Sequence, residues 1–204
     1  FCPDIARLRL PAWDCQPYDR ISPSPRTAAR RAGALHRLAN WDAKRDGTLI
    51  VIATVNGVLQ RVAPRSVMQA AGISAKQGGT VEVERLTAYF AANGYTRTAT
   101  VSERGDFAVR GGVIDVFPAS AEEPVRLDFF GDTLESVRAF DVETQRTTRQ
   151  LKGVEFTPVS EVLIDEAAIS RFRSGFLKRF GGAVSGDPVY DSVSAGARPQ
   201  GAEH

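Results

Sequence analysis

Hydrophobic and polar residues alternate strictly over residues 125–130, and this period of two predicts a β-strand with one buried face. The positions expected to face the core are apolar: Val125, Leu127 and Phe129. The positions on the opposite face combine charge with an aromatic ring: Arg126, Asp128 and Phe130. An aromatic ring beside a guanidinium on the solvent side is typical of a protein-binding hot spot. The pattern therefore favours a recognition surface over a catalytic site.

The first third of the chain has the pattern of a parallel α/β sheet. Residues 7–10 predict a short strand, residues 27–40 place Ala and Leu at helical spacing, and residues 57–62 predict a short helix. Residues 48–55 form a continuous apolar, β-branched run, which indicates a strand buried on both faces. Strand, helix and strand in this order predict half of a parallel sheet.

After Gly72 the pattern changes to one helix followed by short strands, which is typical of a small α+β domain. The helix is expected over 83–93, where Leu86, Tyr89 and Phe90 form its apolar stripe and Gly94 ends it. Turn residues separate five expected strands: 95–101, 107–117, 125–130, 133–141 and 146–156.

Two further features of this half carry specific expectations. Gly111 and Gly112 interrupt the strand expected over 107–117, which predicts a bulge or a close backbone approach. A last helix is expected over 165–179. Four apolar residues are expected on its buried side: Ile169, Phe172, Phe176 and Leu177. The changes of pattern divide the chain into three predicted parts: residues 1–71, 72–157 and 158–204.

Charge is distributed unevenly over these parts, although the 204 residues carry a formal net charge of only +2. Residues 1–71 contain 11 Lys and Arg against 5 Asp and Glu, whereas residues 72–157 contain 10 against 13. A basic segment suits a position near nucleic acid. Because the arginines are scattered rather than arranged in a stripe, an ordinary solvated surface fits them better. This part of the sequence leaves both interpretations open.

Composition excludes several classes of protein. The 43% apolar and 25% charged residues are those of a globular protein, and no apolar run approaches the roughly 20 residues of a membrane span. Two cysteines, Cys2 and Cys15, favour free thiols in a reducing cytoplasm over a disulfide framework. With His36 and His204 as the histidines, no closed structural metal site is expected. Because the chain starts at Phe1 without a methionine and stops abruptly at His204, we expect a piece of a longer protein. The cysteines favour a cytoplasmic location, and the lack of a long apolar run predicts no membrane partner.

The sequence lacks the residues that nucleotide hydrolysis and other catalysis require. No Gly-x-x-x-x-Gly-Lys-[Ser/Thr] loop occurs, so nothing in this chain is expected to hold ATP phosphates and magnesium. Residues 163–167 resemble the acidic box of helicase-type ATPases, but here they precede a helix. Asp165 is therefore predicted to cap that helix and Glu166 to favour its positive end. No catalytic residue, metal ligand or cofactor site is predicted for this chain.

At the level of whole segments, the sequence resembles a known family. Three segments carry the resemblance: residues 104–118, 126–132 and 136–141. They are similar to the UvrA-interaction domain that UvrB shares with the transcription-repair coupling factors. The flanking segments resemble the coupling factors in particular: residues 11–19, 22–25, 55–62 and 141–146. UvrB has a long tyrosine-rich hairpin, for which this chain has no room between Asp19 and Ser22. A fragment of UvrB, or of another helicase-like protein that handles nucleotide or DNA, is the alternative.

The resemblance implies both a fold and a function. The fold is a partial parallel α/β sheet of degenerate helicase-like type, with a small α+β antiparallel-sheet domain inserted. The implied function is a non-catalytic UvrA-recruiting module, with UvrA contacts at Arg110, Arg126 and Phe130. Neighbouring residues are expected to support that interface: Gly111, Gly112 and Asp128.

The resemblance also implies properties of a longer protein. In the family, a carboxy-terminal domain masks the UvrA-binding face, so the isolated module is expected to bind UvrA more readily than the full-length protein does. Other domains of that protein contact RNA polymerase and double-stranded DNA. ATP and magnesium act in its motor domains, which form an ATP-dependent DNA translocase.

Overall fold

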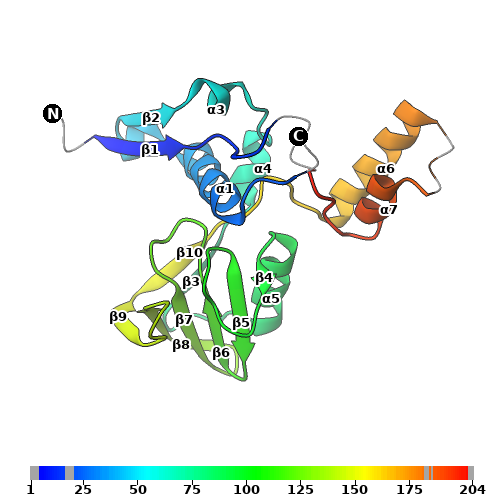
Figure 1. Ribbon diagram of the computed structural model, residues 1–204. Coiled ribbons are helices and arrows are strands. Elements are labelled where there is room, and N and C mark those ends of the chain that lie inside the picture. The colour runs from blue at the N-terminus through cyan, green and yellow to red at the C-terminus, as the bar shows by residue number, and fades with distance from the viewer. Residues whose placement is uncertain (1–4, 17–20, 182–183, 185, 202–204) are drawn as a thin grey trace.

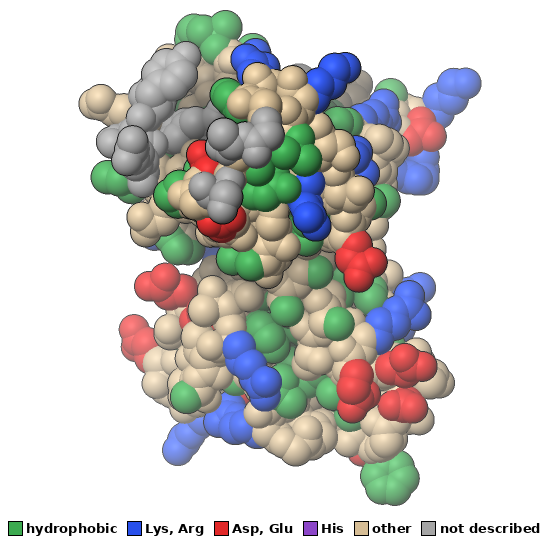
Figure 2. Space-filling view, turned by 90° about the vertical axis from the view of Figure 1, so that its right-hand side faces the viewer, with side chains coloured by type: hydrophobic (Ala, Val, Ile, Leu, Met, Phe, Trp, Pro, Cys, Tyr) green, Lys and Arg blue, Asp and Glu red, His purple; other side chains and the backbone are tan. Residues whose placement is uncertain are grey.

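The computed structural model describes residues 5–16, 21–181, 184 and 186–201. Three groups of elements are visible in Figure 1: an α/β part at the top, a sheet with one helix below it, and a pair of helices at the side. On the side drawn in Figure 2, basic and acidic side chains are intermixed over the upper and lower parts, with hydrophobic side chains between them. Among the described residues, no helix has the length and apolar character that a membrane crossing requires.

The α/β part is built on two parallel strands, as the sequence predicts. β1 (Ala6–Leu10) pairs with β2 (Leu49–Ala53) in parallel, and α1 (Pro25–Asn40) packs against β1. The Ser24 side chain caps α1 by accepting a hydrogen bond from the amide of Thr27, and Pro25 begins the helix, where its missing N–H is no loss. Three short helices follow: α2 (Ala43–Asp46), α3 (Val55–Leu59) and α4 (Arg65–Ala70).

The predicted burial of β2 is wrong. Its apolar side chains are largely exposed: Ile50 is 44%, Val51 41% and Ile52 49% accessible. A strand is buried on both faces only when helices or further strands cover both of them. Within the described residues, β2 pairs with β1 alone. The apolar run therefore forms the predicted strand, but its two faces stay largely uncovered.

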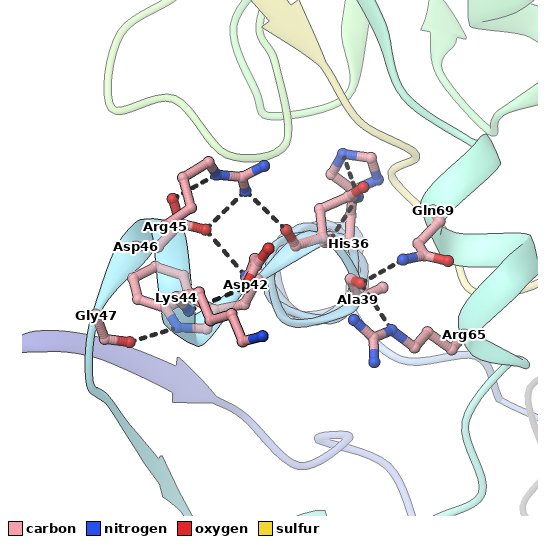
Figure 3. A network of polar contacts seen from close by, with 11 residues as sticks. His36, Ala39, Asp42, Lys44, Arg45, Asp46, Gly47, Arg65 and Gln69 are labelled. Atoms are coloured by element: carbon pink, nitrogen blue, oxygen red, sulfur yellow. Dashed lines mark hydrogen bonds and ion pairs between the residues drawn. The ribbon is translucent and has the colours of Figure 1, made fainter.

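Polar contacts hold α4 at the carboxyl end of α1, where helical carbonyls lack partners within the helix. Arg65 and Gln69 both donate hydrogen bonds to the carbonyl of Ala39, at 2.9 and 2.8 Å (Figure 3). The buried His36 ring lies between the two parts of the molecule. Its Nδ1 is 2.7 Å from the carbonyl of Met68, and its Nε2 is 3.3 Å from the carboxylate of Glu155.

A six-stranded sheet forms the lower part, in the order β4-β5-β6-β7-β8-β9. Its strands are β4 (Thr96–Arg97), β5 (Asp106–Arg110), β6 (Val113–Val116), β7 (Val125–Phe130), β8 (Thr133–Phe140) and β9 (Thr147–Leu151). All neighbours are antiparallel except β4 and β5. A second, two-stranded sheet pairs β3 (Ile73–Lys76) with β10 (Gly153–Phe156). The mixed α/β and α+β class is thus confirmed, whereas the three predicted domain boundaries stay a prediction.

Three predicted spans differ from the observed strands. Residues 107–117 form two strands, β5 and β6, because Gly111 adopts a positive φ of 59° and turns the chain back on itself. Residues 146–156 likewise divide into β9 and β10, which belong to different sheets. Of residues 95–101, only Thr96 and Arg97 are paired. In the first two cases the strand pattern was right but the turn within it was missed, whereas in the third most of the predicted strand is unpaired.

One face of the large sheet packs against α5 (Val83–Ala92), which occupies almost the predicted span. Phe90 is completely buried at the centre of this core. Three rings surround it at centroid distances of 4.9 to 5.3 Å: Tyr95, Phe107 and Phe156. These rings come from the segment after α5, from β5 and from β10, so a single side chain joins both sheets to the helix.

α6 (Glu166–Phe180) and α7 (Pro188–Ser194) form the helical pair at the side. The side chain of Asp165 caps α6, as predicted, by accepting a hydrogen bond from the amide of Ala168 at 2.6 Å. The expected buried side of α6 is only partly covered, because Phe172 and Phe176 pack against Tyr190 of α7. Leu177 remains 41% exposed, so its predicted burial is wrong.

Replacement of Phe90 by Ala is expected to lower the free energy of unfolding by about 3–5 kcal/mol, because it leaves a large cavity among packed rings. Phe130→Ala is the matched control. Phe130 is 77% exposed, so its removal is expected to change stability by less than about 0.5 kcal/mol. Urea denaturation followed by circular dichroism measures both, and similar losses in the two variants would contradict this description of the core.

Two buried tyrosines make stability sensitive to alkaline pH. The Tyr95 hydroxyl donates to the carbonyl of Thr157 at 2.8 Å, and the Tyr89 hydroxyl donates to that of Ala71 at 2.6 Å. Burial raises the pKa of both hydroxyls above their usual value. The folded chain therefore binds these protons more tightly than the unfolded chain does, so stability is complete below about pH 10 and falls as the pH rises further. Melting temperatures between pH 8 and 11 are expected to fall less steeply for Tyr95→Phe than for the parent.

Candidate protein-binding face

The face of the large sheet opposite α5 carries a row of charged side chains on adjacent strands. The register places Asp115 of β6 directly opposite Arg126 of β7, and Arg126 opposite Arg138 of β8. Arg110 lies at the end of β5, where it pairs with Val113. Since side chains alternate between the faces of a strand, these charged groups all point away from the apolar core.

Asp115 is the centre of this row. Its side chain is completely buried, and its carboxylate accepts hydrogen bonds from Arg126 Nε at 2.6 Å and Arg126 Nη2 at 2.9 Å. Arg110 Nη2 donates to the same carboxylate from the other side. A buried carboxylate is stable only when it is paired and hydrogen-bonded. The two arginines meet this requirement and are in turn fixed in place by it.

The two arginines differ in what they leave available to a partner. Hydrogen bonding to Asp115 raises the pKa of Arg126. The Arg126 guanidinium also stacks on the Phe140 ring at 5.0 Å, and its side chain is only 21% exposed. The Arg110 side chain is 54% exposed. A guanidinium has five N–H donors, and the hydrogen bond from Arg110 to Asp115 involves Nη2 alone. Arg110 therefore keeps an open donor edge, meaning that its Nε and Nη1 donors remain available to a partner. Arg126 mainly holds Asp115 in place within the sheet.

Asp128, expected to support the interface, is held in a second pair on the same face. It accepts hydrogen bonds from Arg138 Nη2 at 2.7 Å and from the Ser136 hydroxyl. Arg138 is 36% exposed and was not singled out from the sequence. Together the two acidic groups, Asp115 and Asp128, orient three arginines across four strands.

The predicted aromatic contact residue is exposed, as the alternation of β7 indicates. Phe130 is 77% accessible, whereas Phe129 is partly buried and packs against the core. Phe130 ends β7 immediately before Gly131, which turns the chain at a φ of 58°. The ring in this position is accessible from solvent.

The glycine pair brings the Arg110 end and the Phe130 end of the face together. The Gly112 carbonyl accepts a hydrogen bond from the amide of Phe129 at 2.8 Å, so the β5–β6 turn lies against the end of β7. A Cβ added to Gly112 would lie 2.8 Å from the Phe129 oxygen, a distance that requires the backbone to move. The predicted close backbone approach is thus confirmed at Gly112, although within a turn rather than within a strand.

We name this region the turn-end face and define it by five residues: Arg110, Gly111, Gly112, Arg126 and Phe130. The structure brings all of the sequence-predicted contact residues together here, with Asp128 beside them. Sequence reasoning missed Asp115 and Arg138. Asp115 lies between Ile114 and Val116, which face the core, so strand alternation placed it outward, but its partners depend on the register between strands.

The side chains of this face have the chemical character of a protein-binding surface. The face offers guanidinium donors and an aromatic ring, which together suit a partner surface that combines carboxylates with an apolar notch. Among the described residues, no group of three or more metal-ligating side chains is present. The acidic box at residues 163–167 has its Asp165 engaged in capping α6.

Comparison with known proteins places the region around this face in a known family. Residues 73–161 match the family described as the UvrB interaction domain. Over 199 residues, or 97% of its length, the chain is 36% identical to a transcription-repair-coupling factor of Escherichia coli, of which it covers 17%. It is 35% identical over 96% of its length to that of Haemophilus influenzae, and 37% identical over 82% to that of Myxococcus xanthus. The chain spans about a sixth of the length of these relatives.

Asp115→Asn tests the charge pairing. The amide keeps the size of the side chain but removes the charge that holds both arginines, and it places an NH₂ donor against guanidinium donors. We expect a loss of about 1–3 kcal/mol in the free energy of unfolding, the range for hydrogen bonds to charged groups. Arg110→Ala is the comparison, with a loss of at most about 1 kcal/mol because Arg126 still holds Asp115 through two hydrogen bonds. Equal losses for the two variants in urea denaturation would contradict the central role of Asp115.

Proposed function

Since residues 73–161 belong to the UvrB interaction domain family and almost the whole chain is related to transcription-repair-coupling factors, we propose that this chain is a non-catalytic module that recruits UvrA. The observation that carries the proposal is the turn-end face, where an exposed ring and an arginine with an open donor edge lie at one end of a rigid sheet. A role in transcription-coupled nucleotide excision repair follows from UvrA recruitment by a relative of these factors.

The residues of the face have separate roles in this proposal. Arg110 offers its Nε and Nη1 donors to a carboxylate of UvrA, and Phe130 fills an apolar notch beside it. Arg126 is a positioning residue, because its two hydrogen bonds to Asp115 hold the carboxylate that orients Arg110. With both arginines already fixed, little side-chain entropy is lost on binding.

The longer protein has further roles in this proposal. Contacts with stalled RNA polymerase and with double-stranded DNA are assigned to its other domains, and so is ATP hydrolysis with magnesium. Its own carboxy-terminal domain is proposed to cover the turn-end face until UvrA is needed. The exposed Phe130 is consistent with such a cover, since it leaves an aromatic surface available for contact.

Single substitutions on the face test UvrA recruitment. Arg110→Ala and Phe130→Ala are each expected to weaken binding to UvrA by about 1–4 kcal/mol, the range of interface hot spots, which corresponds to roughly 5-fold to 1,000-fold in Kd. Isothermal titration calorimetry with purified UvrA measures the change. Arg85→Ala is the matched control, since Arg85 is an exposed residue of α5 on the opposite side of the sheet.

The control and the thermal stability decide how the result is interpreted. UvrA binding that survives both substitutions, or that Arg85→Ala weakens equally, would contradict the assignment of this face. Circular dichroism melting curves are expected to match the parent for Phe130→Ala and to shift by at most about 4 °C for Arg110→Ala. A loss of affinity then reports on contact rather than on unfolding.

A further inference from the structure

A cleft of about 830 Å³ lies between the α/β part and the near end of the large sheet. β1 and α1 form two of its walls, and the loop that follows β6, around Ala119 and Ser120, forms the third. Its volume falls within the range of ligand-binding clefts in general. The cleft takes no part in the proposed UvrA contact, because that contact is formed by turns at the other end of the same strands.

The charges in this cleft do not balance. Two of the three acidic residues that line it form ion pairs with arginines, Asp46 with Arg45 at 2.7 Å and Glu122 with Arg104 at 3.1 Å. The third, Glu155, has no arginine partner among the described residues and lies 3.3 Å from His36 Nε2. Hydrogen bonds from the Arg45 side chain lower the pKa of Asp46 to about 2. Three exposed lining arginines are left over: Arg9, Arg30 and Arg37. Within the described part of the chain, no carboxylate lies within ion-pair distance of any of these three.

The three arginines for which the described residues provide no carboxylate partner are spread along the cleft rather than clustered around one position. Arg30 and Arg37 are seven residues apart on α1, so they share one face of the helix and are separated by about 10 Å along its axis. Arg9 lies on β1, across the cleft from α1. Trp41 also lines the cleft. Its Nε1 donates to the carbonyl of Gly47 at 3.1 Å, and the Arg37 guanidinium lies 5.5 Å from its ring.

We propose that this cleft binds the phosphate backbone of a nucleic-acid strand, with Arg9, Arg30 and Arg37 as its phosphate contacts. A basic groove with an aromatic ring beside it is the arrangement by which proteins hold single strands without reading their sequence. A mononucleotide fits less well, because a single phosphate group needs donors that converge on one point. The three guanidiniums are spread over two elements, and the sequence has no glycine-rich phosphate loop.

The location of the cleft makes nucleic-acid binding compatible with UvrA recruitment. A Cβ on Gly33 of α1 would lie 3.6 Å from Ser120, which places the loop after β6 against α1. β6 leads from the Gly111-Gly112 turn to this loop, so the cleft and the turn-end face lie at opposite ends of the sheet (Figure 1). The two sites are therefore expected to fail independently when they are mutated.

Fluorescence anisotropy of the whole 204-residue chain with a labelled oligonucleotide tests the proposal. The probes are a single strand of about 15 nucleotides, its duplex, and labelled ATP. The cleft variant is Arg9→Gln/Arg30→Gln/Arg37→Gln. The matched control, Arg85→Gln/Arg146→Gln/Arg171→Gln, removes the same charge from exposed positions outside the cleft.

The expected result is salt-dependent binding of the single strand that the cleft variant weakens at least tenfold while the control variant retains it. Since each neutralised phosphate of a single strand contributes about 0.7 to the slope of log K against log salt, the cleft variant is expected to lose about 2 from that slope. Tighter binding of the duplex would assign the cleft to a duplex backbone, provided that the same three substitutions abolish it.

Three outcomes would overturn the proposal. The first is no binding of either oligonucleotide at low salt, and the second is an equal loss in both variants, which would report net charge alone. The third is cleft-dependent binding of ATP without binding of the oligonucleotides. UvrA titrations of the same cleft variant separate this proposal from the previous one, because UvrA binding is expected to remain whatever the oligonucleotides do.

Discussion

A carboxylate removed from water must be neutralised by its neighbours, and Asp115 imposes that condition on the whole outer face of the large sheet. Its side chain is completely buried, and two arginines from the flanking strands close around it. Arg126 also stacks on Phe140 of β8, so the pairing extends over four strands. The orientation of Arg110 follows from this arrangement. The open donor edge that we assign to UvrA recruitment thus exists because a buried negative charge holds the other edge of the same guanidinium.

The two proposed binding sites lie at opposite ends of the large sheet. The turn-end face depends on the β5–β6 and β7–β8 turns, and the Gly112 hydrogen bond to Phe129 locks these turns together. The basic cleft depends on the other end of the sheet, where the loop after β6 meets α1. Phe90 joins the helix to both sheets between them. The two proposed sites share no residue, so binding at one does not occupy the other.

Sequence patterns predicted the positions of the strands better than the burial of the strands and the turns between them. The alternation over residues 125–130 placed Leu127 in the core and Phe130 in solvent because a period of two leaves no other choice when one face is buried. The apolar run of β2 gave the strand but not its exposure, since burial depends on what packs against a strand. Gly111 and Gly112 were interpreted as an interruption of one strand, although Gly111 reverses the chain direction and so separates two strands, β5 and β6.

The candidate site shows the same division between local and non-local information. Arg126 and Phe130 stood out from the residue types and the strand alternation, and the family resemblance added Arg110. Asp115 did not, because its importance arises only when the register sets it opposite Arg126 and beside Arg110. The face of a strand on which a residue lies is thus readable from the sequence, whereas its exposure and its electrostatic partners require the fold.

Hydrogen–deuterium exchange of the chain with and without UvrA tests the location of the binding face most directly. We predict that UvrA protects the backbone amides of residues 110–113 and 128–133, while those of α5 and of the basic cleft exchange at unchanged rates. Protection confined to α5, to α1 or to the α6–α7 pair, with the two turns unaffected, would contradict the assignment.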